Sequence, residues 1–134
     1  MKRKNTSRRE SKFMPDVAKG KRLGQWGEEE ACKFLVRQGF IIKDRNYHAT
    51  VGEIDIVAAK GDDFYFVEVK TRYAGPMEYD TAITGGKKYK MQKTIANYCS
   101  RRNIRDAGLV PTSLMVIVDK FKKTASFRLA VMYL

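Results

Sequence analysis

The chain has 134 residues, of which 43% are hydrophobic, enough for one domain with a single core. Its formal net charge of +12 favours a polyanionic partner, because lysine and arginine gain free energy by displacing counterions from phosphates. Its two cysteines and single histidine exclude the ligand spacing of a zinc site. The sequence shows no secretory signal and no apolar run that would cross a membrane, so we expect a cytoplasmic location.

Basic charge is concentrated towards the two ends of the chain. The net charge is +7 in residues 1–22, −4 in residues 23–86 and +9 in residues 87–134. We interpret residues 1–20, which mix Lys and Arg with Asn, Ser and Thr, as a flexible basic N-terminal arm before a domain at 21–134. An acidic middle between basic flanks suits a nuclease, in which carboxylates gather a cation and basic residues hold the nucleic-acid backbone. The alternative is a solvated basic surface without a partner.

The first half of the domain is predicted to contain one helix and three strands. An apolar stripe at helical spacing predicts a helix over residues 23–38, and Gly39 follows where a left-handed cap would end it. Turn residues at 60–63 join the second and third strands into a hairpin. The predicted strands are residues 40–45, 51–59 and 64–70.

The second half is predicted to contain one helix and two strands. A helix over 87–102 is amphipathic, with apolar residues on one side and basic residues on the other. An apolar run at 114–118 predicts a buried strand, and alternating apolar residues at 127–133 predict the last one. The order α-β-β-β-α-β-β predicts an α/β fold with a mixed central sheet flanked by helices.

Acidic residues of the second and third strands are predicted to share one side of the sheet. Side chains alternate along a strand, which groups Glu53 with Asp55 and groups Glu68 with Lys70. A four-residue turn at 60–63 then places Asp55 opposite Glu68 and Glu53 opposite Lys70.

Opposed carboxylates predict a bound cation. Asp55 and Glu68 would repel each other among apolar neighbours, and Mg²⁺ or Mn²⁺, which prefer oxygen ligands, would compensate. Such a metal activates water, and Lys70 would orient that water or stabilise charge on a phosphoryl oxygen. The alternative is a surface ion pair of Glu53 with Lys70, beside carboxylates that merely line a polar face.

Several ordered segments resemble the motifs of the YraN-like family of small bacterial proteins. The first reads Gly-x-x-Gly-Glu at 24–28, the second contains Gly-Glu-Ile-Asp at 52–55, and the third reads Glu-Val-Lys at 68–70. The start of the second helix, with Ala-Ile-Thr at 82–84, also fits. One departure is at 112–116, where the Arg-Phe-Asp-like opening of the family's fourth strand is absent.

The resemblance implies a restriction-endonuclease-like PD-(D/E)XK nuclease fold similar to that of archaeal Holliday-junction resolvases. It implies Glu28, Asp55 and Glu68 as metal ligands and Lys70 as the catalytic lysine. Helical spacing alone does not choose Glu28, since Glu30 also borders the apolar stripe. In this pattern Glu53 either contacts the metal-ligating residues without binding the metal itself or pairs with Lys70.

The expected function is metal-dependent hydrolysis of DNA phosphodiester bonds, with branched or Holliday-junction DNA of repair and recombination as a candidate substrate. The cofactor would be Mg²⁺ or Mn²⁺, and symmetric junction cleavage would predict a homodimer. The alternative is a non-catalytic nucleic-acid-binding module that keeps the nuclease fold. Backbone contacts are expected from basic residues of the second helix, namely Lys87, Lys90, Lys93 and Arg101.

Overall fold

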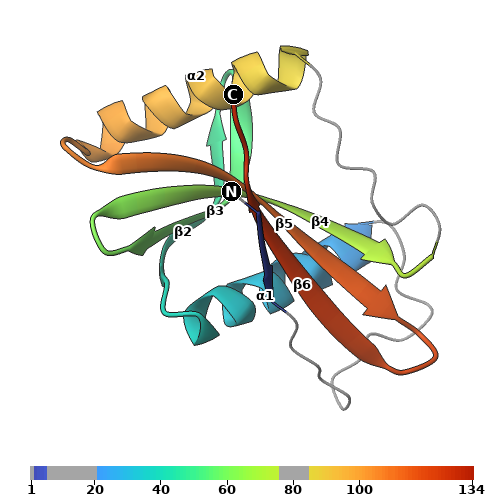
Figure 1. Cartoon of the computed structure of the whole chain (residues 1–134). Coiled ribbons are helices and arrows are strands. Elements are labelled where there is room, and N and C mark those ends of the chain that lie inside the picture. Colours follow the sequence, from blue (N-terminus) through green and yellow to red (C-terminus); the bar gives the residue numbers. More distant parts are fainter. Residues whose placement is uncertain (1, 6–20, 76–84) are drawn as a thin grey trace.

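The structure is a computed structural model that describes residues 2–5, 21–75 and 85–134. Helix α1 spans Lys21–Arg37 and helix α2 spans Gly85–Arg102. Figure 1 shows one twisted sheet with α1 on one face and α2 on the other. The expected motif at 82–84 lies outside the described residues. Neither helix is long and apolar enough to cross a membrane.

Six strands form the sheet in the spatial order β1-β6-β5-β4-β3-β2. Among the described strands only the β4–β5 pair is parallel, and α2 lies in the crossover that a parallel pair requires. The predicted α/β class, mixed sheet and element order are therefore confirmed, with β1 as an addition. The strands are β1 Lys2–Asn5, β2 Ile41–Ala49, β3 Gly52–Lys60, β4 Asp63–Tyr73, β5 Gly108–Asp119 and β6 Thr124–Val131.

Strand β1 belongs to the segment that was expected to be a flexible arm. Residues 2–5 pair antiparallel with β6, from Lys2 opposite Ala130 to Asn5 opposite Phe127. Without β1 the backbone donors and acceptors of β6 would form an open sheet edge, and pairing satisfies them. The prediction of a flexible arm is therefore wrong for these four residues, and residues 6–20 lie outside the described part of the chain.

Two apolar clusters hold the layers together. On one face of the sheet α1 packs on the middle strands, and Phe34 stacks on Phe127 of β6 with ring centroids 4.6 Å apart. On the other face Tyr98 of α2 meets Phe66 of β4 and Tyr47 of β2, edge to face in both cases. The sheet therefore has both faces covered, which explains the long apolar run in β5.

Some strand limits differ from the predicted ones. Strand β5 begins at Gly108, six residues before the predicted start at Leu114, because it follows its parallel neighbour β4 along its whole length. Strand β2 continues to Ala49 through Asn46, whose φ of 52° lies in the left-handed region that Asn tolerates. The last strand ends at Val131, before Tyr133.

Candidate metal and nucleic-acid site

The β3–β4 hairpin has the predicted register only near its turn. Pairing runs from Lys60 opposite Asp63 to Ile56 opposite Val67 and then stops. Asp55 is the next residue of β3, and its Oδ2 accepts a hydrogen bond of 2.8 Å from the backbone N–H of Val69. The expected ladder pairing of Asp55 with Glu68 is therefore wrong, because a side chain replaces the backbone partner where the strands separate.

Strand β3 also changes face at Asp55. Ile56 packs in the cluster on the α1 side, whereas Ile54 and Val57 both pack in the cluster on the α2 side. Strict alternation would have kept Ile54 with Ile56, so the assumption that alternate residues share a face fails across Asp55. The left-handed Asn46 lies on β2 between the partners of Ile56 and Ile54, so both strands are irregular at the same level.

The predicted pairing of Glu53 with Lys70 is not formed. Glu53 is opposite His48 on β2, and its carboxylate lies 3.0 Å from the His48 ring, with the Glu53 side chain 64% exposed. Lys70 lies instead beside Glu68, with Nζ 3.6 Å from Oε1. The Lys70 side chain is only 13% exposed and that of Glu68 is 32% exposed, so this pair is partly shielded from water. The separation of β3 from β4 removes the contact that the register predicted.

Glu28 is positioned by the close packing of α1 on β4. An added Cβ at Gly27 would lie 1.7 Å from Oγ1 of Thr71, so only glycine allows the helix this close to the strand. Thr71 Oγ1 is buried without a hydrogen-bond partner among the described residues. The glycine before Glu28 therefore brings that carboxylate towards the end of β3 that carries Asp55.

Four carboxylates influence one another electrostatically at this point. Burial raises the pKa of Asp55 to about 6; the Val69 N–H opposes this rise, and the charges of Glu28, Glu68 and Glu53 add to it. Burial also raises the pKa of Glu28, while Arg45 lowers it and Glu53 raises it. The residues predicted as ligands from α1, β3 and β4 thus share one region of negative charge.

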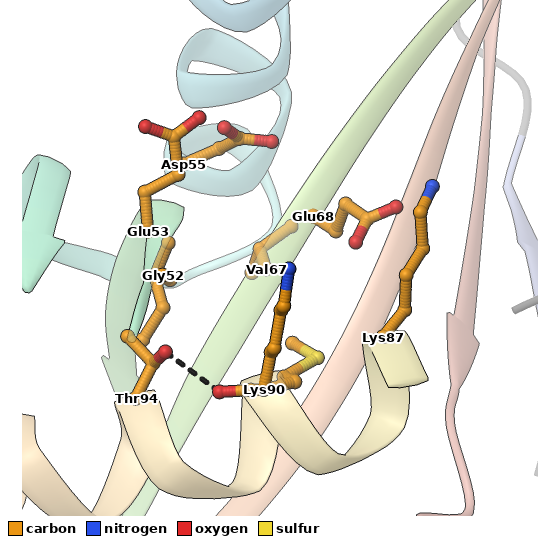
Figure 2. A pocket seen from close by; sticks show the side chains of 10 residues that line it. Gly52, Glu53, Asp55, Val67, Glu68, Lys87, Lys90 and Thr94 are labelled. Atoms are coloured by element: carbon orange, nitrogen blue, oxygen red, sulfur yellow. Dashed lines mark hydrogen bonds between the residues drawn. The ribbon is translucent and has the colours of Figure 1, made fainter. Parts of the chain in front are cut away.

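A cavity of about 350 Å³ lies between this acidic region and α2. In Figure 2 the side chains of Lys87 and Lys90 extend from α2 towards the acidic side chains of Asp55 and Glu68. The cavity therefore combines carboxylates on the sheet with cations on the helix. Its lining residues are Gly52, Glu53, Ile54, Asp55, Val67, Glu68, Lys87, Lys90, Met91 and Thr94.

Helix α2 is docked by a second close approach at a glycine. An added Cβ at Gly52 would lie 2.8 Å from Oγ1 of Thr94, which is buried. The Thr94 hydroxyl donates to the Lys90 carbonyl at 2.7 Å, so it does not point a free donor at the strand. The contact of Gly52 with Thr94 sets the height of α2, and with it Lys90, above the sheet.

The other basic residues predicted on α2 lie outside the cavity. Lys93 is exposed, with its ammonium 5.5 Å from the ring centroid of Tyr89. Arg101 is also exposed, and neither residue lines the cavity. Both remain predicted backbone contacts on the helix surface.

The donor set suits a hard divalent cation. Glu28, Asp55 and Glu68 offer only carboxylate oxygens, which Mg²⁺ and Mn²⁺ prefer. Burial is the largest cause of the raised pKa of Asp55, and the negative charges of Glu28, Glu68 and Glu53, which a cation would offset, add to it. Within 21–75 and 85–134, however, no three acidic, histidine or cysteine side chains already converge around one point. Shared coordination would therefore require rotation of side chains.

Residue-by-residue reasoning missed two parts of this site. Arg45 contacts Glu29 at 3.1 Å and lowers the pKa of Glu28, so it neutralises part of the acidic region from β2. Thr94 sets the position of α2 through Gly52. Arg45 had a signal in the sequence, since the Arg-Asn pair at 45–46 precedes the Gly-Glu-Ile-Asp motif and also resembles the family's second motif, whereas Thr94 had none.

Comparison with known proteins bears on the same residues. Residues 27–133 match the Uncharacterised protein family UPF0102. The chain belongs to this family. UPF0102 is the YraN-like group, so the resemblance found in the sequence is confirmed, and the matched region includes every predicted ligand and Lys70.

Individual UPF0102 proteins align over most of their length. A protein of Clostridium tetani is 34% identical over 81% of this chain and 90% of its own. One of Moorella thermoacetica is 38% identical over 78% of this chain and 88% of its own. One of Dictyoglomus thermophilum is 40% identical over 77% of this chain and 88% of its own. Because the family is described as uncharacterised, membership in it assigns no activity to this chain.

Proposed function

We propose that this UPF0102 protein is a metal-dependent endonuclease that hydrolyses phosphodiester bonds of DNA. The observation that carries the proposal is the Asp55 carboxylate, half-buried where β3 and β4 separate and within electrostatic reach of Glu28 and Glu68. Partly buried carboxylates that lie this close together are costly unless a cation compensates their charge. Lys70 lies beside Glu68, which joins a cation-binding region to a positive side chain on the same strand.

In this proposal Glu28, Asp55 and Glu68 hold Mg²⁺ or Mn²⁺. A bound divalent ion supplies Lewis acidity towards a phosphoryl oxygen and lowers the pKa of water. Asp55 is held by the Val69 N–H through Oδ2, which leaves Oδ1 as the proposed ligand atom. Lys70, which is mostly shielded from water, stabilises negative charge that develops on the phosphate.

Lys87 and Lys90 give the proposed substrate its position. Both line the cavity opposite the carboxylates, so a phosphate between the helix and the sheet would meet positive charge on one side. Lys93 and Arg101 would extend this contact along α2. Branched or junction DNA is the proposed natural substrate, and symmetric cleavage of a junction would use two copies of the chain.

The test is cleavage of labelled four-way-junction, flap, duplex and single-stranded DNA. The wild type is compared with Glu68→Ala and Lys70→Ala, in Mg²⁺, in Mn²⁺ and in chelator. We expect metal-dependent cutting that either substitution lowers by about 100-fold or more, as for loss of one stabilising donor. Glu29→Gln is the matched control, because Glu29 neighbours Glu28 but contacts Arg45.

One observation favours the second candidate, a nucleic-acid-binding module without catalysis. Glu68 is engaged by Lys70, and no three donors converge among the described residues. A module of this kind would bind the same DNAs in chelator as tightly as in metal and would never cut them. That outcome would replace the endonuclease proposal.

A further inference from the structure

The turn between β5 and β6 presents an aromatic side chain to solvent among lysines. Residues 120–123 connect the last paired residues of the two strands, Asp119 and Thr124. The side chain of Phe121 is 99% exposed, more than any other large hydrophobic residue of the described chain. Lys120, Lys122 and Lys123 are exposed beside it. We call residues 120–123 the basic hairpin tip.

The basic hairpin tip has a fixed backbone. Oδ1 of Asp119 accepts hydrogen bonds from the N–H groups of Phe121 and Lys122, both at 3.0 Å. Lys123 completes the turn in the left-handed region, with a φ of 52°. The direction of Phe121 is therefore set by the turn and by the strands that carry it, so its outward position does not come from a loose loop.

The basic hairpin tip is joined to the candidate site by a side-chain contact with β4 and by the pairing of β5 with β4. Lys120 lies with its ammonium 4.3 Å from the ring centroid of Tyr73, which ends β4. Strand β4 carries Glu68 and Lys70, and Lys70 is opposite Met115 on β5. Figure 1 shows the β5–β6 turn reaching past the end of β4, away from α2. Phe121 follows Met115 by six residues: β5 continues for four of them, to Asp119, and the turn supplies the other two.

From this arrangement we infer that the basic hairpin tip binds nucleic acid that has unpaired bases, with Phe121 stacked on an open base face. Aromatic rings stack on bases of any sequence, and neighbouring lysines bind the phosphates that follow. A ring reaches a base face without unstacking base pairs at a strand end, a branch or a single-stranded segment, because paired bases are covered by their neighbours.

The tip would thus direct DNA with open base faces to the carboxylates of β3 and β4. This preference rests on the proposed function in supposing a DNA substrate at that site, but it does not require that the DNA be cut. An exposed aromatic beside lysines would also suit an anionic membrane surface. Nucleic acid is favoured because the tip continues β5, which pairs with the strand that carries Glu68 and Lys70, and because the chain has a net charge of +12.

The test is binding in chelator, where no cutting occurs. Two labelled ligands are used: a blunt duplex, and the same duplex with an unpaired tail that carries 2-aminopurine next to the junction. We expect Phe121→Ala to weaken binding of the tailed duplex by about 5- to 150-fold, the range for one stacked base, and of the blunt duplex by less than about twofold. Phe121→Trp should bind as the wild type does, and wild-type binding should change the 2-aminopurine fluorescence.

The matched control is Tyr133→Ala, which removes an aromatic side chain that is 75% exposed beyond the opposite end of β6. Equal binding of the tailed duplex by wild type and Phe121→Ala would overturn the inference. So would loss of phosphatidylserine-vesicle binding in Phe121→Ala with tailed-DNA binding unchanged. If binding depends on Phe121 but no DNA is cut, the role of the tip stands and the endonuclease proposal fails. If DNA is cut but binding does not depend on Phe121, the endonuclease proposal stands and the role of the tip fails.

Discussion

The Asp55 carboxylate accepts a hydrogen bond from the backbone N–H of Val69, at 2.8 Å, one residue past the last backbone pair of β3 and β4. The N–H of Val69 would otherwise lack a ladder partner on the β3 side, and the side chain takes that role. The same contact holds Asp55 between the strands, where burial and other carboxylates raise its pKa to about 6. The same residue therefore completes the hydrogen bonding of β4 and carries the raised pKa of the candidate site.

The stability of the protein should depend on pH through Asp55. Because its pKa in the folded state, about 6, is above the ordinary value of 3.8, the folded protein binds the proton more tightly than the unfolded chain. The free energy of unfolding should therefore fall as pH rises from about 4 to about 6 and stay lower above that. Asp55→Asn keeps an acceptor for Val69 and removes the ionisation, so it should stabilise the protein at pH 8 by up to about 3 kcal/mol.

Urea unfolding at pH 5 and pH 8 in chelator measures this effect. Asp62→Asn, an exposed carboxylate in the β3–β4 turn, is the control and should not reproduce the gain. Asp55→Asn that is less stable than the wild type at pH 8 would contradict the prediction.

Mn²⁺ binding should require the carboxylates of α1, β3 and β4 together. Calorimetry with Mn²⁺ should show binding by the wild type, and Glu28→Gln or Glu68→Gln should weaken it by at least about tenfold, or about 1.4 kcal/mol. Binding should also raise the melting temperature, since the metal binds only the folded arrangement. Glu29→Gln is the control, because Glu29 is paired with Arg45. Unchanged affinity in Glu28→Gln would remove Glu28 from the ligand set.

Two glycines of α1 should respond in opposite ways to alanine. Gly27→Ala places a methyl group against Thr71 and should destabilise the protein by about 1–3 kcal/mol, the range for overpacking a core contact. Gly24→Ala meets no atom within 4 Å and should stabilise the helix by up to about 1 kcal/mol. Urea unfolding of both variants measures the difference. Thr71→Ala should restore part of the stability lost in Gly27→Ala, and no rescue would mean that the clash lies elsewhere.

Lys90 should contribute to DNA affinity mainly through charge. Lys90→Ala should weaken duplex binding similarly for all sequences and should lower the slope of log affinity against log salt by about one. Lys43→Ala, an exposed lysine on the edge strand β2, is the matched control and should leave the slope unchanged. Anisotropy titrations at several salt concentrations give the slope. If the slope is unchanged in Lys90→Ala, the bound DNA does not contact Lys90 and does not pass over the cavity.

The amino-acid sequence determined the local elements and the first part of the site. Helical spacing of apolar residues predicted α1 and α2, and the turn at 60–63 predicted the register that runs to Ile56 opposite Val67. These features are local, since residues close in the chain interact with periods of 3.6 or 2. The quoted motifs also pointed to Glu28, and the matched family includes it.

Only the tertiary structure decided where the hairpin separates and which groups meet there. Asp55 leaves the predicted ladder at the level of the left-handed Asn46, where β3 continues along β2 while β4 continues along β5. Those are competing pairings between strands distant in the sequence, so no local pattern reveals which pairing wins. Likewise, β1 pairs with β6 across almost the whole length of the chain. Local periodicity fixes which residues form an element, whereas the site depends on non-local pairing that only the assembled sheet provides.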